Sequence, residues 1–280
     1  MVASSDGSDW VKSESMLRLG VFLGVFVLMA LWEIAGPRRT RSVSRVRRWP
    51  GNLGVVLVDT LMTRLVAPAG AVGFALLAET RRWGALHQTE WAGWIEGLIA
   101  FVLLDLTIYL QHRVVHAVSL LWRFHRMHHA DVEVDVTTGA RFHPVEILFS
   151  LGIKFAVIIA LGAPPVAVLL FEVALNATSM FNHSNVRVPA LVEPLLRCLV
   201  VTPDMHRVHH SVLRCETDSN FGFNFPWWDR LFRTYRPEPE SGHERMTIGL
   251  QDFRDPKELR LDCLLTQPFR GEPAKQPDKT

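Results

Sequence analysis

The histidines of this chain are unusual in number and in spacing. Twelve are present, and eight of them fall in three short clusters. The first cluster is His112-x-x-x-His116, and the other two share the pattern His-x-x-His-His, at residues 125–129 and 206–210. Side chains three or four residues apart lie on the same face of a helix. Each cluster can therefore direct at least two imidazoles toward one point, which indicates metal binding.

The number of candidate ligands favours two metal ions. They are His112, His116, His125, His128, His129, His206, His209 and His210, with His183 favoured as a ninth. A structural zinc needs four ligands and a catalytic zinc about three, so this set is too large for one zinc. Imidazole also suits iron. We favour two iron ions, because two adjacent irons can supply electrons to O2 and zinc cannot.

Four further side chains are candidates to orient the ligands or to take part in the reaction: Asp105, Tyr109, His143 and Asp204. Asp105 and Tyr109 share the helical stripe of the first cluster. For His143, a direct bond to metal and an indirect role remain equally open. His87 and His243 lie outside the clusters and are expected to be structural.

Long apolar runs must position these histidines. Hydrophobic residues make up 49% of the chain and are concentrated in runs long enough to span a membrane. Gly162, Pro164 and Pro165 interrupt the last run, so it is expected to form a helical hairpin. We predict an all-α, integral-membrane bundle of four to five spans. The predicted runs cover about residues 16–35, 52–78, 91–111 and 145–176.

The loop after the first run sets the expected orientation. It carries six arginines between Arg38 and Arg48, and basic loops stay in the cytoplasm. All histidine clusters then emerge on the cytoplasmic side, as a helical histidine-rich cap. A bacterial inner membrane is favoured over the endoplasmic reticulum, since no retention signal ends the chain.

Three segments are expected. Residues 1–90 hold a polar N-terminal tail, taken as disordered to about residue 15, and the first two spans. Residues 91–245 hold the oxygenase domain, and residues 246–280 form a loosely ordered tail. Net charge is only +2, which implies no nucleic-acid partner. The cysteines, Cys198, Cys215 and Cys263, are too few and too dispersed for a disulfide framework.

The order of these motifs resembles the sterol desaturase and fatty acid hydroxylase superfamily, over roughly residues 95–236. The matching segments are Asp105-x-x-x-Tyr109-x-x-His112-x-x-x-His116, His125-x-x-His128-His129, Arg141-Phe142-His143-Pro144-x-Glu146, Asn182-His183-Ser184-Asn185, His206-x-x-His209-His210, Asn220-Phe221-Gly222 and Trp228-Asp229-Arg230-Leu231-Phe232-x-Thr234-Tyr235. The resemblance implies a four- or five-span bundle with a cytoplasmic, histidine-bound di-metal site. Arg233 departs from it, because the family usually has glycine there.

These observations predict a membrane-bound, non-haem di-iron oxygenase. It would hydroxylate or desaturate a sterol, fatty acid or related amphiphile that enters from the bilayer, with O2 as co-substrate. Electrons would come from a separate ferredoxin, cytochrome or NAD(P)H reductase, because no haem- or flavin-binding segment is recognisable. Two alternatives remain open: a membrane metal-binding or transport protein, and a non-catalytic scaffold of the same fold.

Overall fold

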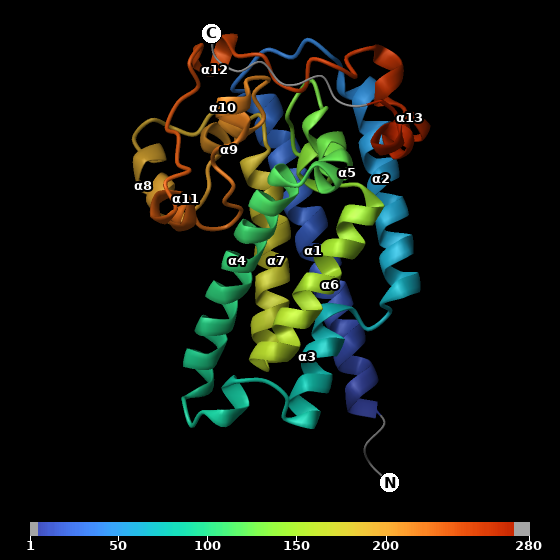
Figure 1. The fold of residues 1–280 in the computed structure, drawn as a ribbon, viewed down its shortest axis with the longest axis vertical. Coiled ribbons are helices and arrows are strands. Elements are labelled where there is room, and N and C mark those ends of the chain that lie inside the picture. Colours follow the sequence, from blue (N-terminus) through green and yellow to red (C-terminus); the bar gives the residue numbers. More distant parts are fainter. Residues whose placement is uncertain (1–4, 272–280) are drawn as a thin grey trace.

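The computed structural model describes residues 5–271, with side chains described from residue 14. Over these residues the chain is nearly all helical and forms no β-strand, only two isolated bridges. Long helices make up a bundle, and short helices and loops cover one of its ends (Figure 1). This confirms the predicted all-α architecture.

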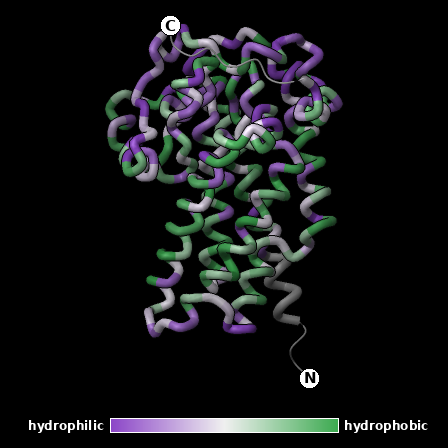
Figure 2. The backbone as a smooth tube through the Cα atoms, viewed as in Figure 1, coloured by the Kyte–Doolittle hydropathy of each residue, from purple (hydrophilic) through white to green (hydrophobic). Residues whose placement is uncertain are grey.

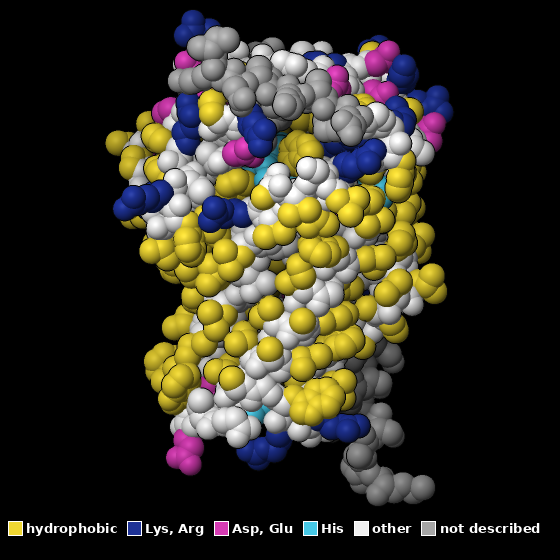
Figure 3. Space-filling view, viewed as in Figure 1, with side chains coloured by type: hydrophobic (Ala, Val, Ile, Leu, Met, Phe, Trp, Pro, Cys, Tyr) yellow, Lys and Arg dark blue, Asp and Glu magenta, His cyan; other side chains and the backbone are white. Residues whose placement is uncertain are grey.

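Five segments are long and apolar enough to cross a membrane, which makes this an integral membrane protein. Figures 2 and 3 show an apolar band around the bundle, with charged side chains concentrated at its two ends. The helices are α1 (Ser5–Ala35), α2 (Arg45–Val66) with α3 (Gly70–Arg81), α4 (Gly93–Ala117), α6 (Pro144–Leu161) and α7 (Pro165–Asn182).

The second crossing is broken, where the sequence predicts one imperfect span over 52–78. The helix α2 ends at Val66, and α3 begins at Gly70. Pro68 lies in the break, and proline cannot donate the backbone hydrogen bond that would continue the helix. The break allows α2 to lie at the edge of the bundle while α3 packs against α6 and α7.

The predicted hairpin of the last run is confirmed. The helix α6 ends at Gly162, whose φ of +67° belongs to the left-handed region, and α7 begins at Pro165. A Cβ atom on Gly162 would lie 2.4 Å from the carbonyl oxygen of Trp83. The hairpin turn therefore requires glycine, both for its backbone conformation and for the close approach of the neighbouring loop.

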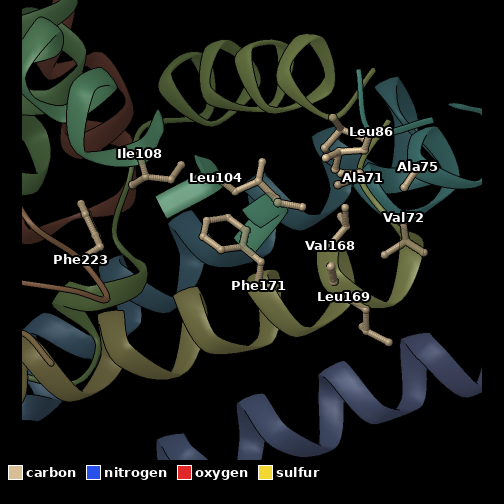
Figure 4. Close-up of a cluster of buried hydrophobic side chains, with 14 residues drawn as sticks. Ala71, Val72, Ala75, Leu86, Leu104, Ile108, Val168, Leu169, Phe171 and Phe223 are labelled. Atoms are coloured by element: carbon tan, nitrogen blue, oxygen red, sulfur yellow. The ribbon is translucent and has the colours of Figure 1, made fainter. Parts of the chain in front are cut away.

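Small side chains let the helices of the bundle approach one another closely. Ala71 and Ala75 of α3, Ala100 of α4 and Ala167 of α7 are buried in one cluster with larger side chains such as Phe171. Figure 4 shows this cluster, with Ile108 and Phe223 at one end. Close packing of this kind favours helix association in membranes.

The covered end of the bundle is called the cap. It contains α5 (Ser119–His129), η2 (Thr138–Ala140), α8 (Glu193–Leu199), α9 (Pro203–His209), α10 (Arg214–Thr217), α11 (Trp227–Leu231), α12 (Gly242–Arg245), η3 (Pro256–Leu259), α13 (Leu261–Thr266) and η4 (Gln267–Phe269). A short 3-10 helix, η1 (Leu86–Gln88), lies at the opposite end. On α8 and α11, Leu195, Trp227 and Leu231 are exposed and extend the apolar surface of the bundle onto the cap (Figure 3).

Both terminal expectations need correction. The chain is already helical from Ser5, so only residues 1–4 of the predicted disordered tail lie outside the described residues. At the other end, residues 246–271 are packed rather than loosely ordered. Leu264 is fully buried against α2, and the backbone oxygen of Gln267 accepts a 2.6 Å hydrogen bond from Arg126. Residues 272–280 lie outside the described residues.

Candidate metal centre

Nine histidines converge inside the cap in two groups. His112, His116, His125, His129 and His209 form a five-histidine group, and His128, His183, His206 and His210 form a four-histidine group. Within each group the candidate ligand atoms lie within 4.8 Å of one another. These are the nine residues that the sequence nominates, drawn from α4, α5, α9 and the end of α7.

The second and third clusters each contribute histidines to both groups. His128 and His129 follow each other on α5 yet belong to different groups, and so do His209 and His210. The imidazoles of His129 and His210 stack with ring centroids 4.6 Å apart, which places the groups side by side. The arrangement therefore offers two adjacent metal positions.

Six of the imidazoles have a hydrogen-bond partner at Nδ1: the carboxylate of Asp218 lies 3.4 Å from His116, and the other five imidazoles make shorter hydrogen bonds. The acceptors are the backbone oxygens of Phe221 for His112, Arg141 for His128, Ser179 for His183 and Ser219 for His209, and the carboxylate of Glu146 for His125. Donation from Nδ1 leaves the lone pair of a neutral imidazole on Nε2. A metal-binding histidine commonly has its other nitrogen held in this way.

The Nε2 atoms are placed as metal ligands would be. The Nε2–Nε2 distance is 3.0 Å between His112 and His209, and 3.0 Å between His183 and each of His128 and His206. In the pairs His112–His209 and His128–His183 each Nδ1 donates to a backbone oxygen, so the two facing Nε2 lone pairs have no proton to share and repel each other. A metal bound at about 2.1 Å from each nitrogen would hold neighbouring octahedral ligands about 3.0 Å apart. The donor set therefore fits two first-row metal ions.

Burial favours the neutral form of several of these imidazoles. It lowers the pKa of His183 and of His209 to about 3. Burial, followed by neighbouring histidines, also lowers the pKa of His128, His129 and His206 well below the usual value. Neutral imidazole is the form that binds metal.

Two polar networks hold the loops that supply the backbone acceptors. The carboxylate of Asp229 accepts hydrogen bonds of 2.8 Å from the backbone nitrogens of Phe221 and Gly222, and so fixes the loop that contacts His112. In the second network, the fully buried Arg48 pairs with Asp131 and Asp135, each at 2.7 Å. These ion pairs tie α2 to the loop that follows α5.

Three of the residues nominated from the sequence have partners outside the histidine groups. Trp228 donates a 2.8 Å hydrogen bond to Asp105, and the hydroxyls of Tyr109 and Thr234 lie 2.8 Å apart. Asp204 pairs with Arg38, at 3.1 Å, and with Arg207. These contacts join α4 to the α11 segment and the arginine loop to α9, so they support the centre from a distance.

His143 belongs to neither histidine group in the described residues. Its Nδ1 accepts the backbone hydrogen bond of Val145 at the start of α6, and its Nε2 lies 3.1 Å from the backbone oxygen of Leu265. The structure therefore places His143 as a helix cap that contacts the C-terminal segment. This differs from both roles considered from the sequence.

Glu146 is a further candidate site residue: it belongs to the motif that spans Arg141 to Glu146, but it was not among the site residues nominated from the sequence. Its Oε1 lies 2.7 Å from Nδ1 of His125, and the residue is 7% exposed. A carboxylate at this position makes the imidazole more basic and fixes its ring. The position of Glu146 could have indicated this role. It lies three residues after His143, in the first turn of a helix that starts beside the second histidine cluster.

A cavity connects the five-histidine group to the interior of the bundle. Its volume is about 610 Å³. At one end it is lined by His112, His125, Phe142 and Phe223, and it continues between α1, α2, α6 and α7. A molecule in the cavity would therefore contact both the histidines and the membrane-spanning helices.

The geometry thus defines an all-helical membrane protein with a buried nine-histidine centre. The family description "Fatty acid hydroxylase" matches residues 97–234, which include all nine histidines. The chain belongs to the fatty acid hydroxylase family, within the sterol desaturase superfamily. This confirms the resemblance drawn from the motifs. No solved structure matches the chain at a significant level.

Several curated proteins are similar to this chain. An ornithine lipid hydroxylase of Rhizobium tropici is 27% identical over 79% of this chain and 68% of its own length. The alkylglycerol monooxygenase of Xenopus tropicalis is 29% identical over 64% of this chain. A very-long-chain aldehyde decarbonylase of rice is 25% identical over 52% of this chain. The matches cover only 38% and 24% of the last two relatives.

Proposed function

We propose that this protein is an O2-dependent di-iron hydroxylase or desaturase of a membrane lipid. The observation that carries the proposal is the cavity that joins two adjacent histidine groups to the interior of a membrane-spanning bundle. The family match and the names of the relatives, which include a lipid hydroxylase and a monooxygenase, agree with it.

The nine histidines would hold two iron ions, one in each group. When bound, the irons supply the electrons that activate O2 for attack on an unactivated C–H bond. The chain's own groups prepare the site for that chemistry. The Nδ1 hydrogen bonds hold the imidazoles in place before metal binds, and the stack of Phe142 on His128, 4.4 Å between centroids, excludes water from one side. Such preorganisation lowers the cost of reaching the reactive geometry.

The substrate would be an amphiphile that enters from the bilayer. The relatives act, by their names, on ornithine lipids, alkylglycerols and very-long-chain aldehydes. These share an apolar chain joined to a polar group, which suits a cavity between membrane-spanning helices. Electrons would come from a separate ferredoxin, cytochrome or NAD(P)H reductase.

The centre would face the cytoplasm, in a bacterial inner membrane. Six arginines between Arg38 and Arg48 lie at the cap end of the bundle, whereas Arg81 and Arg82 lie at the other end. The excess of basic side chains at the cap end favours a cytoplasmic cap. The histidines lie at this end rather than near the bilayer midplane, where transporter sites are usually found.

Metal content and lipid products of the purified protein test the proposal. We expect about two irons per chain after anaerobic reconstitution, magnetically coupled in Mössbauer spectra. His128→Ala should abolish the coupling, while His87→Ala, at the opposite end of the bundle, should retain it. Reconstituted protein given O2, a reductase system and membrane lipids should convert a lipid to a product heavier by one oxygen or lighter by two hydrogens. Failure to bind iron in wild type, or coupling that survives in His128→Ala, would refute the assignment.

A further inference from the structure

The cavity contains hydrogen-bond acceptors that the protein itself does not satisfy. They are Oδ1 of Asp59 on α2, Oε1 of Gln111 on α4 and Oε2 of Glu146 on α6. All three residues line the cavity, and within residues 5–271 none of these atoms has a hydrogen-bond partner. Buried polar atoms are almost always paired, so three unpaired acceptors around one cavity indicate a ligand that donates.

Asp59 differs from Glu172 and Glu33 of the same bundle in having no cation. Glu172, which lines the same cavity, is paired with Lys154 at 2.6 Å and with Arg18 at 2.8 Å. Glu33, near the cap, is paired with Arg41 and Arg45. Among the described residues, no lysine or arginine forms an ion pair with Asp59. Glu172 and Glu33 are thus compensated by cations, whereas Asp59 lines the cavity without one.

A carboxylate inside a membrane-spanning segment is costly unless a partner compensates it, and such residues commonly mark a binding site. An ammonium group would supply both a positive charge and three donors, whereas a hydroxyl supplies one donor and no charge. The missing partner of Asp59 is therefore best matched by a protonated amine. Gln111 and Glu146 offer further acceptors for the same polar group.

We propose that the cavity binds an amine-bearing amphiphile, with the protonated amine paired to Asp59. This inference rests on the proposed function, since it names the class of lipid presented to the histidines. The position of Asp59 is suitable for binding the amine of a lipid whose other part reaches the histidines. It lies two helical turns, about 10 Å, along α2 from Asn52, whose amide contacts Asp131 beside the histidine groups.

The far end of the cavity limits how the lipid can lie. Arg18, Lys154 and Glu172 form a closed ion-pair cluster there, so that end presents charge rather than a purely apolar wall. A hydrocarbon chain would gain little by extending past this cluster. The amine would therefore lie between the histidines and the cluster, with the carbon to be oxidised toward His112 and His125.

Ligand selectivity of the metal-free protein tests this directly. Three probes of equal chain length, dodecylamine, 1-dodecanol and lauric acid, are titrated into the full chain in nanodiscs, with equilibrium binding measured by calorimetry. We expect wild type to bind dodecylamine at least about tenfold tighter than either other probe. Asp59→Asn should lose that preference, because an amide keeps the shape and removes the charge. Asp262→Asn, which removes an exposed carboxylate of α13, should retain it.

Equal binding of the three probes by wild type would overturn the inference, and this needs no variant to fold. Tighter binding of 1-dodecanol would also overturn it, in favour of a hydroxyl donor and an uncharged Asp59. An undiminished preference in folded Asp59→Asn would do the same. Because the protein is metal-free in this assay, a lack of amine selectivity would not count against iron binding or lipid oxidation, which metal content and product analysis test. Conversely, amine selectivity in a protein that binds no iron would refute the proposed function alone.

Discussion

Glu146 provides the sharpest test of how the centre is held. Its Oε1 lies 2.7 Å from Nδ1 of His125, and Glu146 is 7% exposed, so this hydrogen bond is charge-assisted and shielded from water. Loss of an outer partner of this kind commonly lowers metal affinity about 10- to 100-fold, which corresponds to about 1.4–2.8 kcal/mol. Glu146→Gln keeps the side-chain shape and an acceptor oxygen, and removes the charge. We expect it to fall within that range.

The structure also predicts which metal would be lost first. Glu146 contacts His125 of the five-histidine group, whereas His128 and His183 of the four-histidine group are held by backbone oxygens. In Glu146→Gln, increasing chelator should therefore lower the metal content to about one per chain before the second metal is removed.

The assay is a competition titration of anaerobically reconstituted protein against a calibrated chelator, with iron counted per chain. Glu79→Gln, an exposed acid-to-amide change at the opposite end of the bundle, is the matched control. The thermal unfolding midpoint of each metal-free variant checks that it folds. If folded Glu146→Gln retains both irons with wild-type affinity, the argument that this carboxylate supports His125 is refuted.

Three further predictions follow from the cap and the bundle. Arg48→Met should destabilise the protein by about 3–5 kcal/mol, because it leaves the buried carboxylate of Asp135 without its cation and leaves Asp131 with Arg141 alone; thermal unfolding measures this, and an unchanged midpoint would contradict it. Gly162→Ala should lower the unfolding midpoint as well, since φ of +67° alone costs about 1–2 kcal/mol and the new Cβ would lie 2.4 Å from the oxygen of Trp83; Gly152→Ala, inside α6 with open space at its Cβ, should not lower it. Cys198 and Cys215 are exposed in the cap, so a membrane-impermeant maleimide should label them in inside-out vesicles but not in intact cells; the reverse pattern would contradict the cytoplasmic orientation.

The sequence was sufficient to predict the apolar helices and the convergence of the histidines. Both predictions depend on local periodicity: an apolar run of sufficient length forms a span, and histidines three or four residues apart share a face. The prediction of the hairpin also depends on local sequence, since a glycine followed closely by two prolines, as at Gly162, Pro164 and Pro165, interrupts a helix.

The partners of individual side chains could not be predicted in the same way. Asp105 shares a helical stripe with His112 yet accepts a hydrogen bond from Trp228, which lies on α11. His143 caps α6 because Pro144 begins that helix. The other ring nitrogen of His143 lies next to the backbone oxygen of Leu265, which is far away along the chain. Such pairings depend on tertiary packing, which spacing along the chain does not encode.

At Arg233, a departure of the sequence from the family pattern correctly indicated an unusual backbone conformation. The family usually has glycine at this position, and Arg233 has a φ of +60°. A left-handed backbone is unfavourable for a side chain with a Cβ atom. The neighbouring bonds, from the backbone nitrogen and hydroxyl of Thr234 to Asp229, hold the turn in place. The turn geometry is thus retained without the glycine.

The distribution of the histidines along the chain also has a consequence for biogenesis. Each group includes residues of the last cluster: His209 completes the five-histidine group, and His206 and His210 complete the other. During synthesis, α4 and α5 emerge from the ribosome long before α9, and the α6–α7 hairpin must be inserted between them. Neither group can close around a metal until that insertion is finished. If the two groups bind iron as proposed, loading would be a late, post-insertion event, and a nascent or truncated chain that ends before α9 would lack a complete set of candidate ligands for either metal.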